Sequence, residues 1–157
     1  MQTAIVLSDT HHNVQAVEKL LPLMQEANFI VHLGDGAGDL SRYALLLKGK
    51  LHRMAGNCDD SSLGMREEVI EVEGVRIFAC HGHNYGVKQQ LGLLARRAKE
   101  CGCTVALYGH THEGRMDEVD GVLCINPGCT TRYALNPSYC FLVVHNGKVT
   151  AKLVEIF

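Results

Sequence analysis

The sequence contains no tryptophan, and aromatic residues make up only 6% of its 157 residues. Positive and negative side chains are also nearly equal in number, with 15 lysines and arginines against 17 aspartates and glutamates. Proteins that bind single-stranded nucleic acid use stacking aromatics and a basic groove, and this chain has few of the residues for either. A nucleic acid is therefore not the expected partner, and a nuclease is the least favoured of the enzyme classes considered.

Long apolar runs are missing too, and no stretch approaches the roughly 20 residues that a membrane-spanning helix needs. We expect no signal peptide, because a strand-like apolar segment begins within a few residues of Met1. The seven cysteines are an odd number without paired metal-binding spacing, so reduced thiols are expected. These features predict a cytoplasmic protein with no membrane partner.

The rest of the composition is typical of a globular chain, with 46% hydrophobic and 20% charged residues. Neither an internal repeat nor a linker-like stretch interrupts the sequence. We therefore predict a single domain over residues 1–157, which buries about two thirds of its unfolded surface on folding. The oligomeric state stays open, a homo-oligomer included.

Apolar spacing predicts alternating strands and helices in the first half of the chain. Residues 3–7, 29–33 and 51–54 are short apolar runs typical of strands buried on both faces. Between them, 14–24 and 40–47 have helical spacing, and Asn13 is placed to cap the first helix. The second half predicts a hairpin over 68–80, a helix over 91–98, a strand over 105–108, and hairpin turns at Asp120-Gly121 and Asn146-Gly147. This order indicates an α/β fold.

Polar residues suited to catalysis follow the ends of five predicted strands. They are Asp9 and His11, then Asp35, then Asn57, then His81 and His83, then His110 and His112. Ligands collect at the carboxyl ends of parallel strands, so these side chains are expected at one rim. Carboxylates, an amide and imidazoles suit Mn²⁺, Fe²⁺, Ni²⁺ or Zn²⁺. One ion would need only about four of them, which predicts two ions sharing a carboxylate, an arrangement typical of phosphoryl transfer.

The order of these motifs resembles a known family. The motifs are Ser8-Asp9-Thr10-His11, Gly34-Asp35, Gly56-Asn57-Cys58-Asp59, His81-Gly82-His83 and Gly109-His110-Thr111-His112. They follow one another as in the calcineurin-like metallophosphoesterases, and are most similar to the small YfcE-type phosphodiesterases of bacteria and archaea. The resemblance extends to Asn126-Pro127-Gly128. It implies a four-layer α-β-β-α sandwich of two mixed sheets flanked by helices, with a metal site at the C-terminal ends of the strands.

The resemblance also implies a role for individual residues. The first of two divalent metal ions would be bound by Asp9, His11, Asp35 and His112. Asp35 would bridge to the second ion, which would be completed by Asn57, His81 and His110. Mn²⁺ is expected first, with Fe²⁺, Ni²⁺ or Zn²⁺ as alternatives. A hydroxide between the two ions would attack the phosphorus of a small phosphate ester in line, which makes the chain a phosphoesterase and more specifically a phosphodiesterase.

One position departs from the wider superfamily. Many larger relatives carry a histidine directly after the motif asparagine, where it is thought to assist the leaving group, but this chain has Cys58. A thiol with an ordinary pKa of about 8.5 does not simply replace an imidazole as an acid. The general acid therefore stays open, with His83 as one candidate.

A second relative supplies an alternative function. The retromer complex contains a subunit that resembles these enzymes but acts as a protein-binding scaffold, with several site residues altered. All seven ligand positions of this chain hold competent side chains, which favours an enzyme.

The remaining polar residues favour structural roles. Three histidines in or beside predicted strands are expected to be packed and hydrogen-bonded: His32, His52 and His145. Asp59 is expected to orient a neighbouring group or to cap a turn. His12, Arg115 and Arg132 are expected mainly in solvent, with a substrate phosphate as the alternative partner of either arginine.

Overall fold

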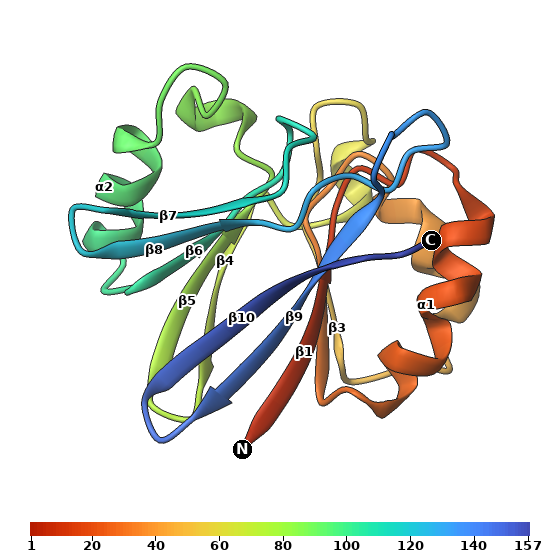
Figure 1. Ribbon diagram of the computed structural model, residues 1–157, viewed down its shortest axis with the longest axis horizontal. Coiled ribbons are helices and arrows are strands. Elements are labelled where there is room, and N and C mark those ends of the chain that lie inside the picture. The colour runs from red at the N-terminus through yellow and green to blue at the C-terminus, as the bar shows by residue number, and fades with distance from the viewer.

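The computed structural model describes residues 1–157 and contains two five-stranded sheets (Figure 1). The first has the order β10-β9-β1-β2-β3, with β1 (Gln2–Leu7), β2 (Phe29–His32), β3 (Leu51–Arg53), β9 (Ser138–His145) and β10 (Lys148–Glu155). The second has the order β4-β5-β6-β8-β7, with β4 (Glu67–Val72), β5 (Val75–Cys80), β6 (Val105–Leu107), β7 (Arg115–Val119) and β8 (Val122–Asn126). The helices are α1 (Val14–Glu26), α2 (Gly92–Glu100) and the short 3-10 segments η1 (Ala37–Tyr43), η2 (Ser61–Leu63) and η3 (His83–Tyr85). Both sheets combine parallel and antiparallel pairs, so both are mixed as predicted.

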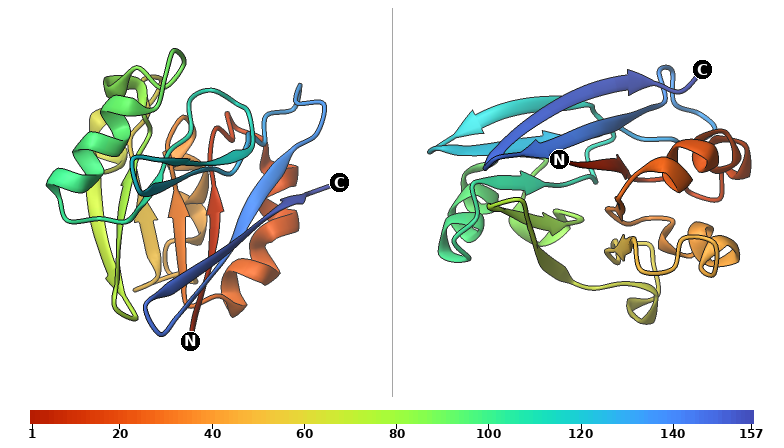
Figure 2. Two further views of the ribbon diagram at one scale, coloured as in Figure 1. Left: turned by 60° about the vertical axis from the view of Figure 1, so that its left-hand side comes forward. Right: turned by 90° about the horizontal axis from the view of Figure 1, so that it is seen from below.

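Successive side chains of each central strand face two different layers. In β1, Val6 belongs to the buried cluster between the two sheets, whereas Ile5 packs against α1. In β5, Ile77 faces the other sheet and Phe78 packs against α2. Figure 2 shows the two helices on opposite outer sides of the paired sheets. The predicted four-layer sandwich is therefore confirmed.

The first helix begins where the sequence predicts. The Asn13 side chain accepts a hydrogen bond from the Ala16 backbone N–H at 3.4 Å and so caps α1. Val17, Leu20 and Met24 recur at helical spacing and are buried against the first sheet. No helix of the structure combines the length and the apolar character that crossing a membrane requires.

The predicted helix over 40–47 is wrong in type. The chain there forms η1, and turns continue to residue 50. Leu40 and Leu47 are buried as the spacing predicts, but the Asp39 side chain binds outside the segment. It accepts hydrogen bonds from the Thr10 hydroxyl and from the His12 backbone N–H. These contacts hold the segment against the loop after β1. The apolar spacing of the segment indicates a regular helix, but it does not include these contacts.

Both predicted hairpin turns are confirmed. Asp120 and Gly121 connect β7 to β8, and Asn146 and Gly147 connect β9 to β10, all with φ between 50° and 82°. Two consecutive residues of positive φ match the twist of the flanking strands. The expectation of a packed His145 is wrong, because this last residue of β9 pairs only with β10 and is exposed.

The cysteines are distributed as small apolar residues. Cys80, Cys103 and Cys124 belong to the cluster under α2, and Cys140 belongs to the cluster between the sheets. All seven are free thiols, and only Cys58 is exposed. Packing therefore explains most of the cysteines, whereas Cys58 lies apart from the core.

Candidate metal centre

The loops after β1, β2, β3, β5 and β6 meet at one rim, at the top of Figure 1. They carry the seven residues predicted as ligands: Asp9, His11, Asp35, Asn57, His81, His110 and His112. The Asp9 backbone N–H donates to the Gly34 carbonyl at 2.9 Å, and the His110 backbone N–H donates to Asp9 Oδ2 at 3.1 Å. The structure thus brings together residues that are up to 103 positions apart in the chain (His112 and Asp9, 112 − 9).

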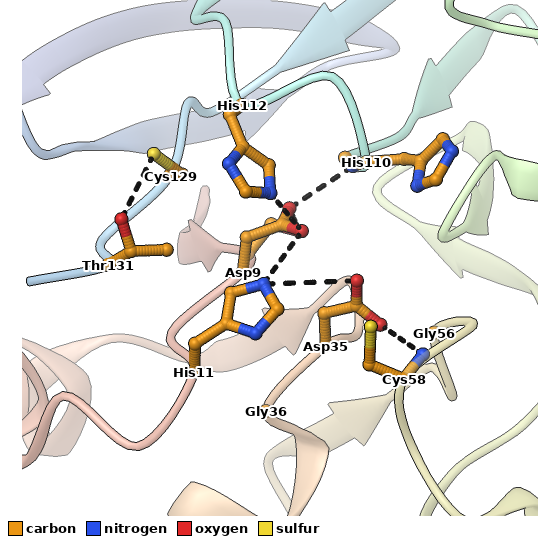
Figure 3. Close-up of polar contacts among 12 residues, drawn as sticks. Asp9, His11, Asp35, Gly36, Gly56, Cys58, His110, His112, Cys129 and Thr131 are labelled. Carbon is orange, nitrogen blue, oxygen red and sulfur yellow. Dashed lines mark hydrogen bonds and ion pairs between the residues drawn. The ribbon is translucent and has the colours of Figure 1, made fainter. Parts of the chain in front are cut away.

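The ligand atoms form two groups. Asp9, His11 and His112 offer atoms within 4.8 Å of one another, and so do Asp35, His81 and His110. Asn57 joins the second group, with its Oδ1 atom 3.0 Å from His81 Nε2. Asp35 lies between the groups, since its Oδ2 atom is 3.3 Å from His81 Nε2 and 3.9 Å from His11 Nε2 (Figure 3). One carboxylate oxygen therefore faces both groups, as a shared ligand must.

The surroundings of the two Asp9 carboxylate oxygens indicate whether a cation fits the first group. Its Oδ2 atom accepts hydrogen bonds from the Ser8 hydroxyl at 2.6 Å and from the His110 N–H. Its Oδ1 atom is buried without a hydrogen-bond partner and faces His112 Nε2 at 3.2 Å and His11 Nε2 at 3.8 Å. An unpartnered buried carboxylate oxygen costs free energy unless a positive charge compensates it. Carboxylate oxygen and imidazole nitrogen together suit a divalent transition metal, so the first group fits.

The neighbours of the two His81 ring nitrogens indicate whether a cation fits the second group. Its Nδ1 atom lies 2.7 Å from the Leu33 carbonyl oxygen, which only accepts, so the proton of the neutral ring lies on Nδ1. The lone pair of Nε2 then faces two oxygen acceptors, Asn57 Oδ1 at 3.0 Å and Asp35 Oδ2 at 3.3 Å, and His110 Nδ1 lies 3.2 Å away. Electron-rich atoms at these distances repel one another unless a cation lies among them. The second group therefore fits a metal as well.

The backbone of the rim is strained. Five of the seven predicted ligands, Asp9, His11, Asp35, His110 and His112, have φ between 40° and 69°. This left-handed region is uncommon for residues other than glycine. Such strain collects at sites where function requires a fixed geometry.

Asp59 holds two of the loops in place. Its carboxylate accepts hydrogen bonds from four backbone N–H groups, those of Asp35 at 2.7 Å, Gly36 at 2.9 Å, Ala37 at 3.3 Å and Gly56 at 2.9 Å. Gly56 allows this close approach, because a Cβ atom there would overlap the Asp35 carboxylate. The prediction that Asp59 orients its neighbours is confirmed.

His32 is the packed, hydrogen-bonded residue that the sequence predicts, and it lies beneath the rim. The Gly34 backbone N–H donates to its Nδ1 atom at 3.0 Å, and its Nε2 atom lies 3.0 Å from the Thr10 hydroxyl. Complete burial lowers the pKa of His32 to about 4. His52 is satisfied differently, with its Nδ1 atom 2.6 Å from Glu68 Oε2.

Electrostatics at the rim favour ionised carboxylates. Burial raises the pKa of the Asp35 carboxyl, but the His81 ring and the Cys58 backbone N–H outweigh this effect, and the pKa lies below its ordinary value. The negative charge of the Asp9 carboxylate raises the pKa of His112, whereas burial and the neighbouring His81 lower the pKa of His110. The carboxylates therefore provide the negative charge that a divalent ion needs.

His83, the candidate proton donor, and Cys58, which stands where larger relatives carry a histidine, lie near the second group. The His83 ring is 5.4 Å from the His81 ring and 6.2 Å from the His110 ring, centre to centre, and its Nδ1 atom is buried without a hydrogen-bond partner. Cys58 is exposed, and burial of its thiol and the nearby Asp35 raise its pKa.

Other polar residues lie outside the two groups. Arg115 forms an ion pair with Asp117 at 2.6 Å, and its exposed side chain belongs to β7. The His12 side chain is 92% exposed and pairs with Asp39 at 3.2 Å. These positions match the expected surface roles.

The loop after β8 also belongs to the rim, which the strand ends considered above did not predict. β8 is parallel to β6, so its carboxyl end points the same way. The Thr130 backbone N–H donates to the Asp9 carbonyl at 3.3 Å, and the Thr130 carbonyl accepts from Asn13 Nδ2 at 2.7 Å. Figure 3 shows Cys129 and Thr131 beside His112. The strand-end rule would have found this loop had it been applied to β8.

Comparison with known proteins agrees with this geometry. Residues 1–148 match the model of the calcineurin-like phosphoesterase superfamily domain. A protein of Mycoplasma pneumoniae named a probable metallophosphoesterase is 30% identical over 160 residues, covering 96% of this chain and 94% of that protein. A phosphodiesterase of Methanocaldococcus jannaschii is 27% identical over 143 residues, covering 78% of this chain and 81% of that enzyme.

Solved structures share the fold. A Streptococcus pneumoniae protein described as a predicted phosphoesterase superposes with a TM-score of 0.83 and 23% identity, over 99% of this chain and 90% of that one. Vps29 of Chaetomium thermophilum superposes with a TM-score of 0.79 and 16% identity, over 99% of this chain and 97% of that one. The family match over most of the sequence shows that the chain belongs to the calcineurin-like superfamily of metal-dependent phosphoesterases, in its small YfcE-type branch.

Proposed function

We propose that the chain is a phosphodiesterase of the cytoplasm that works with two divalent metal ions, Mn²⁺ being the first expectation. One ion would be held by Asp9, His11, Asp35 and His112, and the other by Asp35, Asn57, His81 and His110. The observation that carries this proposal is the position of Asp35 Oδ2, which faces His11 and His81 from one carboxylate. The diesterase activity of the Methanocaldococcus relative supports the choice of a diester as substrate.

When bound, two such ions supply Lewis acidity and a nucleophile drawn from water at neutral pH. The protein itself fixes the ligands. The Leu33 carbonyl holds His81 in the tautomer that turns Nε2 toward Asp35, and the Asp59 carboxylate holds the backbone of Asp35 and Gly56. Such outer contacts set ligand orientation and affinity.

Protonation of the leaving alcohol falls to residues at the edge of the second group. His83 is the first candidate, because its buried Nδ1 atom has no partner within the protein. Burial lowers the pKa of His83, which makes its charged form a stronger acid. The alternative is that no side chain protonates the leaving oxygen, which Cys58 in place of the usual histidine favours.

The second candidate function is a protein-binding scaffold, and Vps29 has the same fold as this chain. The complete set of ligand side chains favours the enzyme, since a scaffold has no need to maintain Asp9 Oδ1 without a partner.

The test is hydrolysis of bis(4-nitrophenyl) phosphate by protein reconstituted with Mn²⁺. We expect turnover that requires metal and stops on chelation, and slower turnover of the monoester 4-nitrophenyl phosphate. Asn57→Ala and His81→Ala should abolish activity while the protein stays folded, and the exposed His145→Ala serves as the matched control. Metal-loaded, folded protein that hydrolyses no ester would support the scaffold instead.

A further inference from the structure

A cavity with a volume of about 1010 Å³ opens beside the proposed metal centre. Two of the predicted ligands, His11 and His112, form one end of it. The rest of the cavity is lined by β10 and by the loop after β8, and the function proposed above assigns no role to this part. Its size is at the upper end of the range for small-molecule sites.

A second, smaller cavity of about 270 Å³ lies on the other side of the same centre. It is lined by His11 and Asp35 and reaches Cys58. His11 therefore separates two spaces of unequal size. A phosphodiester carries two alcohols, so one phosphate at the centre can direct one alcohol into each cavity.

The walls of the large cavity are mainly apolar. Ala134 and Leu135 from the loop and Leu153 and Val154 from β10 line it. Leu135 is 96% exposed, so its apolar surface has no partner within the protein. An apolar ligand that covered this surface would gain about 25 cal/mol for each Å² removed from water.

The charges around the cavity disfavour a second anion. Glu113 and Glu155 contribute two carboxylates, and Arg132 contributes one guanidinium. Arg132 is exposed and forms no ion pair. Away from the metal centre, a further phosphate would meet two carboxylates and one guanidinium, whereas an uncharged ligand would not be repelled by the carboxylates.

We infer that the large cavity binds the alcohol that remains on the phosphate when the other leaves, and that this alcohol is bulky, uncharged and partly apolar. The inference rests on the proposed function, because it places the reacting phosphate at the metal centre. The substrates would be phosphodiesters with one large neutral substituent. The loop over residues 131–136 would then determine specificity.

The experiment compares three esters that share 4-nitrophenolate as leaving group, using the full chain loaded with Mn²⁺. The retained alcohol is methanol, thymidine, or thymidine bearing a 3′-phosphate. We expect kcat/KM for the thymidine ester to exceed that for the methyl ester by about tenfold, which corresponds to burial of roughly 60 Å² of apolar surface. The 3′-phosphate should remove most of this gain.

Two variants alter the cavity. Ala134→Trp fills it and should erase the preference for thymidine over methyl, while Glu155→Lys should raise turnover of the 3′-phosphorylated ester relative to the thymidine ester by about fivefold. Leu93→Trp on the exposed side of α2 and Glu18→Lys on α1 are the matched controls and should change neither ratio. If Ala134→Trp does not fold, the exposed pair Tyr133→Ser and Leu135→Ser replaces it and should lower the preference.

Binding separates this inference from the proposed function. Methyl thymidine 5′-phosphate lacks a good leaving group, and its dissociation constant is measured by titration calorimetry. If no ester is hydrolysed, the proposed function fails, but about tenfold weaker binding of this diester in Ala134→Trp would still support the cavity. Equal kcat/KM for the methyl and thymidine esters in the parent, a preference for the 3′-phosphorylated ester, or unchanged ratios and binding in Ala134→Trp would overturn the inference.

Discussion

Protonation of His32 is expected to destabilise the protein between pH 6.5 and pH 4. The Gly34 N–H donates to its Nδ1 atom, so Nε2 carries the proton and donates to the Thr10 hydroxyl. Thr10 in turn donates to the Asp39 carboxylate. A second proton on Nδ1 would face the Gly34 N–H directly. Both neighbours of Thr10, Asp9 and His11, are predicted ligands, so the disturbance would reach the rim.

The expected loss of stability follows from the difference between the pKa values of His32 in the unfolded and the folded protein. Burial lowers the pKa of His32 from 6.5 to about 4 in the folded protein, so the unfolded chain binds the proton more readily. Stability from this group is complete above pH 6.5 and is lost as the pH falls toward 4. One pKa unit corresponds to about 1.36 kcal/mol, which gives a loss of about 2 kcal/mol by pH 5 and about 3 kcal/mol in full.

The assay is urea unfolding of the metal-free protein at pH 7.5, 6 and 5. His32→Gln should be less stable than the parent at pH 7.5, and the difference should shrink by about 2 kcal/mol at pH 5. The exposed His145→Gln should stay parallel to the parent throughout. In the parent, the His32 ring resonance should show no protonation above pH 5. Titration of that resonance near pH 6.5, or parallel curves for parent and His32→Gln, would refute the reasoning.

Two further predictions concern separate residues. Burial raises the pKa of Glu67, but hydrogen bonds from Tyr85 and Arg97 outweigh this and hold it below its ordinary value. Glu67→Gln should therefore lower the urea midpoint at pH 7, and the difference should shrink as the pH falls from the ordinary glutamate pKa of about 4.3 through the lower folded pKa; a difference that persists in strong acid would contradict this. Cys58→His should speed hydrolysis of alkyl esters by about 10²-fold or more and leave nitrophenyl esters nearly unchanged, because an added general acid helps only a poor leaving group. If the parent already hydrolyses both ester classes equally and His83→Ala slows the alkyl esters alone, His83 supplies the proton.

The central strands and the rim could be predicted because local patterns determine them. Val6 and Ile5 face different layers but are both apolar, so a strand buried on both faces is visible in the sequence. The ends of such strands then locate Asp9, Asp35 and His81 without any knowledge of distances.

Two features could not be read because they depend on contacts distant in the chain. Asp39 binds Thr10, 29 residues away, and η1 forms in place of the expected α-helix. The large cavity is lined by residues 131–136 and by β10, and neither segment shows a chemical motif. His145 belongs to this class as well, since its exposure follows from the extent of β9 beyond β1.

The central claim is that Asp35 joins two metal groups, and metal content tests it most directly. Protein reconstituted with Mn²⁺ and freed of excess metal is analysed by mass spectrometry for metal per chain. We expect two ions per chain in the parent, a loss at both positions in Asp35→Ala, and two ions in the exposed-turn control Asp120→Ala. One ion per chain in the parent, unchanged in Asp35→Ala, would contradict it.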